Sequence, residues 1–333
     1  MKKVLSIILA VLMAFTLVAF VGCSTEENLK LGLGVYSAYG NGKNADGETN
    51  GSASVATTAA VLLLDKDGKI VKCQIDTADS AVAYTSAGEL VASSAYKTKG
   101  ELGDGYGMVA YGGAAKEWDE QVAALCKVVE GKTLNEVKGM IVNGYKGNEE
   151  VINAGCTIGI SDFILAIEKA FANAEDSTAT AKDTLSLAFV TKQEKGKNAT
   201  AEADGSCDVV SYICATAVDA DGKVTAIKSD VTSANFKFNV KGEFKTDATA
   251  ALKSKRELGE SYGMSAYGQD LNGDGTVKEW FEQADVLDDA CIGKTATDIA
   301  KLAVNGYGDE AIQAAGCTIA ISDMVAVAVK AAE

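Results

Sequence analysis

The sequence predicts an α+β protein made of two tandem copies of one domain, in which an antiparallel sheet packs with C-terminal helices. Two observations support this prediction. A series of short motifs occurs twice, in the same order, along the 333 residues. In each copy the β-prone runs come first and the helical patterns later, without the alternation that indicates a parallel sheet. The length is sufficient for two domains of ordinary size.

The repeat is visible at motifs that keep both their residues and their order. Three such pairs are Asp67-Gly68-Lys69 with Asp221-Gly222-Lys223, Lys116-Glu117-Trp118 with Lys278-Glu279-Trp280, and Gly155-Cys156-Thr157 with Gly316-Cys317-Thr318. These pairs predict repeat domains at 31–172 and 184–333. The polar stretch 173–183 between them has the composition of a linker.

Each copy begins with β-prone runs, the first two of which are joined by an Asp-Gly turn. Asp-Gly between two such runs is a typical hairpin signal. The expected strands are, copy by copy, 55–64, 69–75 and 81–84, and then 209–218, 223–227 and 235–240.

Each copy continues with a glycine-rich loop and then with helices. Apolar residues at helical spacing predict one main helix in each copy, and the pattern Thr133 with Glu136 is typical of a capping box at the start of a short helix. A β-prone piece at 156–160 then leads to a final helix, with Ser161, and in the second copy Ser322, expected as its N-cap. The expected main and final helices are 116–129 and 162–172, and then 277–290 and 324–332.

The N-terminus predicts export and membrane attachment. A basic start and a long apolar run form a secretory signal peptide at 1–22. Its end, with Cys23 directly after Gly22, resembles a bacterial lipobox. We therefore expect a lipid on Cys23 and a tether at 23–30. The alternative is an uncleaved membrane anchor, because the apolar run is just long enough to span. Both place the protein on the extracytoplasmic face of the cell membrane, and the membrane is then a partner through the lipid anchor.

The composition excludes several classes of function. The chain contains no histidine, so Ser-His-Asp and Cys-His catalysis are excluded, and a hydrolase is disfavoured. The formal net charge of −15 repels phosphates and makes nucleic acid an unsuitable partner. Seven cysteines besides Cys23 cannot all pair within one chain and lack any CxxC motif, so buried free thiols are expected.

Three features together carry a family resemblance. They are the Asp-Gly-Lys hairpin, the glycine-rich segment Leu102 to Gly107, and Gly155-Cys156-Thr157 before an apolar helix. In outline, each half resembles the FMN-binding domain of exported bacterial flavoproteins. This family includes flavinylated lipoproteins that take part in extracellular electron transfer in Gram-positive bacteria. The resemblance implies FMN attached to the hydroxyl of Thr157 and Thr318.

The same motif departs from the family pattern beside each threonine. Ala154 and Ala315 stand where the family has Ser or Thr, and Cys156 and Cys317 stand where it has a small alanine. Non-covalent FMN, or no cofactor, therefore remain alternatives to covalent attachment.

Physical chemistry supports the same region as a binding site. A phosphate favours the N-terminus of a helix with hydroxyls nearby, and an isoalloxazine ring favours aromatic walls. The candidate cofactor-binding residues are Thr157, Ser161, Tyr106 and Trp118 in the first copy and Thr318, Ser322, Tyr262 and Trp280 in the second. The alternatives are a simple helix cap for the hydroxyls and core packing for the tryptophans.

The second copy contains an insertion that resembles the start of an EF-hand calcium loop. Asp270, Asn272 and Asp274 supply oxygen ligands at alternating positions, followed by Gly275. The twelfth position should be Glu and is Phe281. The alternative is an ordinary Asp/Asn/Gly loop before the next helix.

Two functions are compatible with these features. The first is a membrane-anchored lipoprotein that binds FMN in each repeat and carries electrons to or from a redox partner at the cell surface. The second is a cofactor-free cell-surface binding or structural module, whose duplication adds avidity or reach. Both favour a non-catalytic protein over a hydrolase, and the lack of βαβ alternation disfavours a two-lobed solute-binding protein.

Overall fold

The computed structural model describes residues 27–93, 96–268, 270, 273 and 275–333. The signal peptide and Cys23 lie outside the described residues. The described chain is a mixed α+β structure with antiparallel sheets, as the sequence predicts. In this part of the chain, no helix combines the length and the apolar composition needed to cross a membrane.

The first half of the chain (27–183) forms a five-stranded antiparallel sheet with the order β4-β3-β2-β1-β7. Its strands are β1 (Lys30–Tyr39), β2 (Gly51–Leu64), β3 (Ile70–Tyr84), β4 (Leu90–Val91) and β7 (Glu175–Asp176). The expected hairpin joins β2 to β3. Its turn is closed by a bond of 3.0 Å from the Gly68 amide to the Asp65 carbonyl, and Gly68 has a φ of 71°, which favours glycine.

The second half (184–333) forms a three-stranded antiparallel sheet with the order β10-β9-β8. Its strands are β8 (Thr184–Lys197), β9 (Gly205–Val218) and β10 (Val224–Phe238). The opening strand of each half, β1 and β8, was not among the expected strands. The extended segments expected at 81–84 and 235–240 belong to the long third strands β3 and β10, except for the last residues of the second segment.

The helices follow the long strands in both halves and come in the same order. The first half has α1 (Lys99–Leu102), η1 (Gly103–Tyr106), α2 (Met108–Gly112), α3 (Trp118–Val129), α4 (Leu134–Lys138), α5 (Glu149–Ala154) and α6 (Ser161–Ala172), with a small hairpin of β5 (Ile141–Val142) and β6 (Lys146–Gly147). The second half has α7 (Lys255–Leu258), η2 (Gly259–Tyr262), α8 (Met264–Tyr267), α9 (Trp280–Cys291), α10 (Ala296–Ile299), α11 (Glu310–Ala314) and α12 (Ser322–Ala332), with β11 (Ala303–Val304) and β12 (Tyr307–Gly308). The capping box predicted from Thr133 and Glu136 is confirmed at α4.

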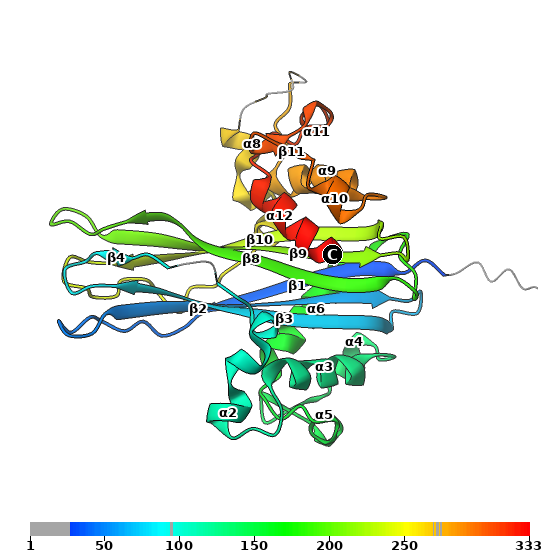
Figure 1. The fold of residues 1–333 in the computed structure, drawn as a ribbon, viewed down its shortest axis with the longest axis horizontal. Coiled ribbons are helices and arrows are strands. Elements are labelled where there is room, and N and C mark those ends of the chain that lie inside the picture. Colours follow the sequence, from blue (N-terminus) through cyan, green and yellow to red (C-terminus); the bar gives the residue numbers. More distant parts are fainter. Residues whose placement is uncertain (1–26, 94–95, 269, 271–272, 274) are drawn as a thin grey trace, which may run out of the picture.

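The layers form a helix–sheet–sheet–helix sandwich (Figure 1). Helices α3 and α6 cover the outer face of the first sheet, and α9 and α12 cover the outer face of the second. The inner faces of the two sheets pack against each other through a shared apolar core. Leu33, Val61 and Leu63 of the first sheet meet Phe189 and Ile213 of the second in this core, and all five are buried.

The two halves contact each other through reciprocal pairs. The ammonium of Lys169 on α6 pairs with Glu257 at 2.6 Å and donates to the carbonyl of Val35 at 2.8 Å. The aligned Lys330 on α12 pairs with Glu101 and donates to the carbonyl of Phe189. Each contact is therefore made twice, with the roles of the halves exchanged.

The same reciprocity extends to the strand ends. The aligned rings of Tyr84 and Phe238 stack on each other, with centroids 4.6 Å apart and planes 5° apart. The amide of Leu90 donates to the Asn198 side chain, and the amide of Phe244 donates to the Asn44 side chain in return. This is the geometry of an isologous interface formed within one chain.

Two local expectations were wrong at the motif before the last helix. Helix α6 begins at Ser161 with Ile160 at the N-cap, and Ser322 likewise follows Ile321, so neither serine is the N-cap. The piece at 156–160 forms no strand, because Gly155 turns the chain with a φ of 104° and only Gly159 makes an isolated bridge.

The segment expected as a linker, 173–183, is packed against both sheets. Its strand β7 pairs with β1, and Ala179 is fully buried in the core between the sheets. The amide of Leu29 donates to the carbonyl of Ala179 at 2.8 Å.

Candidate functional site

The repeated Gly-Cys-Thr motif is held by a buried glutamine that was not among the predicted site residues. In the first half, both the amide and the hydroxyl of Thr157 donate to the Gln121 side-chain oxygen, at 2.9 and 3.0 Å. The Gln121 amide group donates in turn to the carbonyl of Lys116 at 3.0 Å. Gln121 is 1% exposed, so this contact fastens the turn before α6 to the start of α3.

The second half repeats this arrangement. The amide and hydroxyl of Thr318 donate to the side-chain oxygen of Gln283 at 2.8 and 3.2 Å, and Gln283 donates to the carbonyl of Lys278 at 2.9 Å. Both threonine hydroxyls are thus engaged by a buried amide. The signal that could have identified these glutamines is their recurrence one turn after the repeated Lys-Glu-Trp motif.

A cavity of about 380 Å³ in the first half brings together three of its four candidate binding residues. Tyr106, Trp118 and Ser161 line it, and Thr157 does not. The cavity lies between the outer face of the sheet, the start of α3 and the start of α6. The remaining lining residues are Ala56, Thr58, Thr77, Asp79, Lys99, Met108, Tyr145, Ile158, Gly159, Asp162 and Phe163.

The ammonium of one lysine lies over the rings of both Tyr106 and Trp118 in this cavity. The Lys99 ammonium lies 5.1 Å from the ring centroid of Tyr106 and 5.6 Å from that of Trp118, and it pairs with Asp79 at 3.0 Å. Burial alone would lower the pKa of Lys99, but Asp79 and Tyr106 outweigh burial and raise that pKa. Lys99 is therefore held protonated at the cavity wall, as the cation of an ion pair with Asp79.

The second half has the same lysine–aromatic cluster. The Lys255 ammonium lies 5.2 Å from the ring centroid of Tyr262 and 5.0 Å from that of Trp280. Trp118 and Trp280 are 4% and 2% exposed and belong to the outer cores of their halves. Most of each indole is therefore buried in the core. This agrees with core packing, the alternative role considered for the tryptophans.

Ser322, the remaining candidate, is exposed beside an ion pair. The neighbouring carboxylate of Asp323 pairs with Lys192 of β8 at 2.7 Å. In the first half the aligned Asp162 accepts a bond of 3.2 Å from the Ser161 hydroxyl and lines the cavity instead.

The candidate calcium loop is only partly within the described chain. Both oxygens of the Asp270 carboxylate accept backbone amides, one from Gly273 at 2.7 Å and the other from Gly275 at 2.9 Å. Asn272 and Asp274 lie outside the described residues. Within the residues that are described, no cluster of three or more acidic or cysteine side chains has the geometry of a metal site.

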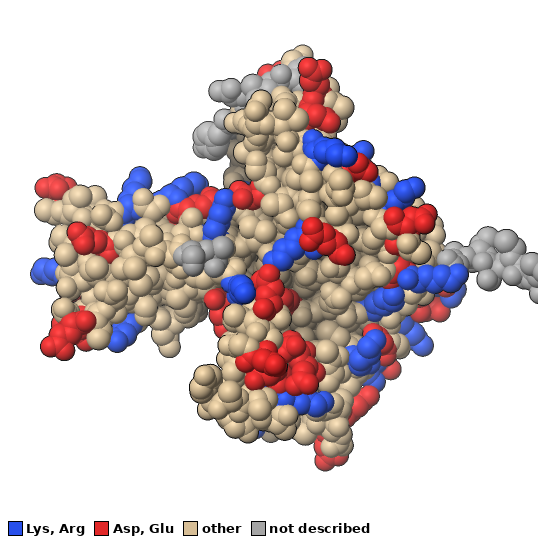
Figure 2. All heavy atoms as spheres, viewed as in Figure 1, with Lys and Arg blue, Asp and Glu red and all other residues tan. Residues whose placement is uncertain are grey.

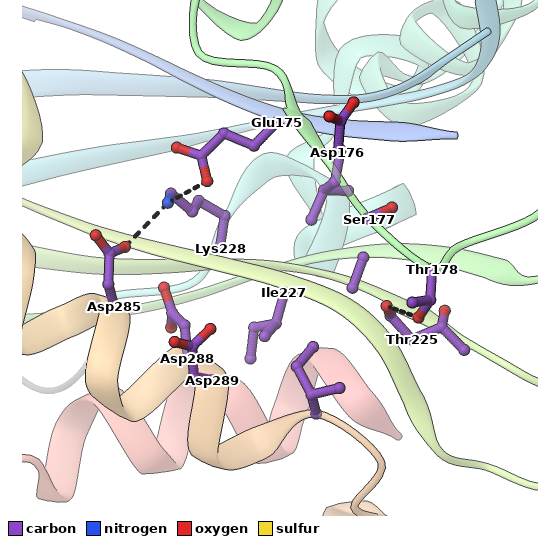
Figure 3. Close-up of a pocket in the computed structure, with 13 residues that line it drawn as sticks. Glu175, Asp176, Ser177, Thr178, Thr225, Ile227, Lys228, Asp285, Asp288 and Asp289 are labelled. Atoms are coloured by element: carbon purple, nitrogen blue, oxygen red, sulfur yellow. Dashed lines mark hydrogen bonds and ion pairs between the residues drawn. The ribbon is translucent and has the colours of Figure 1, made fainter. Parts of the chain in front are cut away.

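A hollow of about 440 Å³ lies where β7, β10 and α9 meet, and acidic side chains surround it (Figure 3). Lys228 bridges Glu175 of the first half, at 2.8 Å, and Asp285 of α9, at 3.0 Å. Arg256 pairs with Asp285 and with the buried Asp288, each at 2.8 Å. Burial opposes ionisation of Asp285, but Arg256 and Lys228 outweigh it and lower its pKa. Of these ion pairs, the one between Lys228 and Glu175 joins the two halves, and the others lie within the second half.

The surface charge is mixed on the face seen in Figure 2, where both acidic and basic side chains occur over both halves among uncharged residues. All seven cysteines of the described chain are free and buried, as predicted. Burial raises the pKa of Cys156, Cys207 and Cys317 to about 11 each, so these thiols stay protonated at neutral pH.

Comparison with known proteins identifies no relative: no family model, no curated protein and no solved structure matches the chain.

Proposed function

We propose that this chain is an extracytoplasmic lipoprotein, anchored in the membrane through Cys23, that binds FMN without a covalent bond and carries electrons to or from a redox partner at the cell surface. The observation that supports the proposal is the cavity at the start of α6. It gathers aromatic, hydroxyl and cationic groups in one place, and its volume of about 380 Å³ is within the usual range for small-molecule sites.

The residues around the cavity suit the parts of FMN. The first backbone amides of the twelve-residue helix α6 have no partner within the helix, so they suit a phosphate beside the Ser161 hydroxyl. Lys99 is the cation among the lining residues, where Asp79 and Asp162 are the carboxylates, so a bound phosphate would share Lys99 with Asp79. Tyr106, Tyr145 and Met108 supply aromatic and apolar walls.

The position of Thr157 favours non-covalent binding. Its hydroxyl donates to Gln121 and is not among the lining residues of the cavity, so the proposed FMN is held by contacts with the cavity walls. When bound, FMN supplies one- and two-electron chemistry. The role of this chain is then to bind the cofactor and to orient it at the membrane surface.

We also propose that the chain arose as two tandem copies of one domain. The matching order of elements and the reciprocal contacts of Lys169 and Lys330 support this proposal. The shared core between the sheets means that the two copies form one folded body.

The proposal is tested by titrating the purified chain, without residues 1–23, with FMN and following the loss of flavin fluorescence. We expect saturable binding, with Lys99→Ala and Tyr106→Ala each weaker by about tenfold or more, a change of ~1.4 kcal/mol. Riboflavin, which lacks the phosphate, is the matched ligand and is expected to bind more weakly.

Three results would contradict it. Binding too weak to saturate would support the cofactor-free module. Affinity unchanged in both variants would place the site elsewhere. Flavin that stays on the protein after acid precipitation from a flavinylating host, and is lost in Thr157→Ala, would indicate covalent attachment.

A further inference from the structure

The two halves differ at the strand positions that border the cavity. Their alignment in this region is anchored by equivalent hydrogen bonds, Ser37 to Thr57 at 3.0 Å in the first half and Thr191 to Ser211 at 2.9 Å in the second. From these anchors, the small residues Ala38, Gly40, Ala56 and Thr58 of the first half align with the larger residues Lys192, Glu194, Val210 and Tyr212 of the second.

The small residues leave space in the first half. Ala56 and Thr58 line the cavity described above, and Ala38, Gly40 and Ala56 line an adjoining hollow of about 440 Å³. The two spaces share Asp79 and Asp162 as well as Ala56, so they are contiguous along the outer face of the sheet.

The large residues form a closed network in the second half. The Tyr212 hydroxyl donates to Glu194 at 3.1 Å, and the Lys192 ammonium pairs with Glu194 at 3.3 Å and with Asp323 at 2.7 Å. The same ammonium lies 5.6 Å from the Tyr212 ring centroid. The Tyr212 ring packs against the outer core of this half.

We infer that the chain holds one FMN molecule, in its first half, and that Tyr212 and Lys192 close the equivalent site of the second half. The identity of the ligand rests on the function proposed above, whereas the closure rests on the side chains alone. A ligand entering the second half would have to displace a packed ring and leave the Asp323 and Glu194 carboxylates without their lysine, and both changes cost free energy.

The two halves supply each other's control variants. Thr58→Tyr places in the first half the tyrosine found at the aligned position of the second half. Lys192→Ala with Tyr212→Thr places in the second half the alanine and threonine found at the aligned positions of the first half. Equilibrium dialysis with FMN measures the number of molecules bound per chain, and thermal unfolding without FMN measures how each change affects packing.

We expect one FMN per wild-type chain, none in Thr58→Tyr, and two in the Lys192→Ala, Tyr212→Thr variant. Without FMN, Thr58→Tyr adds a ring to open space but removes the buried hydrogen bond of 2.8 Å between the Thr58 and Thr77 hydroxyls. Its unfolding midpoint should therefore fall by less than that of Tyr212→Thr, which empties packed space and should lower the midpoint by several degrees.

The number of FMN molecules bound and the unfolding midpoints together show whether the proposed function or the closure of the second half fails. Two FMN molecules per wild-type chain, or binding that survives in Thr58→Tyr, would overturn the inference. If wild type binds no FMN, the proposed function fails, and the midpoints then decide the closure. Equal losses of midpoint in Thr58→Tyr and Tyr212→Thr would show that both positions are equally filled and would overturn it.

Discussion

At the residue scale, Gln121 and Gln283 are the clearest case of a side chain with a defined task. Each accepts both donors of the repeated threonine and donates to a backbone carbonyl at the start of the preceding main helix. Thr157 is exposed and Thr318 half-buried, whereas both glutamines are 1% exposed, so the contact provides the buried glutamine amides with the hydrogen bonds that they would otherwise lose.

Gln121→Ala is expected to lower the free energy of unfolding by about 1–3 kcal/mol, because it leaves the Thr157 amide and the Lys116 carbonyl without their partner. Urea denaturation followed by circular dichroism measures this. Thr157→Val is the matched control. It removes only the hydroxyl bond, so we expect a smaller loss, about 0.5–1.5 kcal/mol. Equal losses in the two variants would mean that the backbone bond contributes nothing.

At the element scale, the loop before each main helix is secured by one glutamate. The Glu117 carboxylate accepts the amides of Met108 and Val109 at 2.8 and 2.9 Å, and the Glu117 amide donates to Glu120 in a capping box. Glu279 does the same for Met264 and Ser265. The short helix α2, with its glycines, is thereby held against the start of α3.

Glu117→Ala is expected to destabilise the chain by about 1–2 kcal/mol, the usual cost of a lost N-cap interaction. Protease cleavage within 103–113 should accelerate, because α2 loses its contact with α3. Glu120→Ala, which removes only the reciprocal bond of the box, serves as the control. A cleavage rate like that of wild type in Glu117→Ala would show that the loop is secured by other contacts.

The same element predicts a pH effect in the second half. Hydrogen bonds from the Ser265 side chain and then from backbone amides lower the pKa of Glu279. The stability that this carboxylate contributes is therefore present above its unfolded pKa and is lost as the pH falls through its lower folded pKa.

At the scale of the whole molecule, the core between the sheets makes the two halves interdependent. Ile213 and Val61 are fully buried there and come from different halves. The reciprocal ion pairs and the Lys228 bridge add polar contacts across the same boundary.

We expect wild type to unfold in one transition, and Ile213→Ala to shift that whole transition with a loss of about 2–5 kcal/mol. Scanning calorimetry and near-ultraviolet circular dichroism measure it. Val327→Ala, in the outer core of the second half alone, is the control and should also shift a single transition. Two separate transitions, only one of them sensitive to Ile213→Ala, would show that the halves unfold independently.

Local signals predicted the central hairpins, the main and final helices and the short helix after Thr133, because each depends on near neighbours. The short helices α1 and α2 formed where a glycine-rich loop was expected, and α5 was not predicted. The Asp-Gly turn and the Thr133 capping box each involve residues a few positions apart. Local signals did not predict the strands β1 and β8. In β1 the reason lies in the tertiary structure. Gly32 and Gly34 weaken the local β signal there, yet the sheet requires them. A Cβ at either position would lie within about 2.1 Å of a backbone atom of α6.

The sequence by itself determined the α+β class, the repeated order of elements and the position of the Gly-Cys-Thr motif before a helix, because these follow from local patterns that occur twice. Only the tertiary structure decided that a glutamine engages the Thr157 hydroxyl, and that the first half is open where Tyr212 and Lys192 fill the second. The physical reason is that a cavity depends on which side chains from distant strands and helices meet, and single positions such as Thr58 and Tyr212 change its volume without changing the pattern that forms the strand.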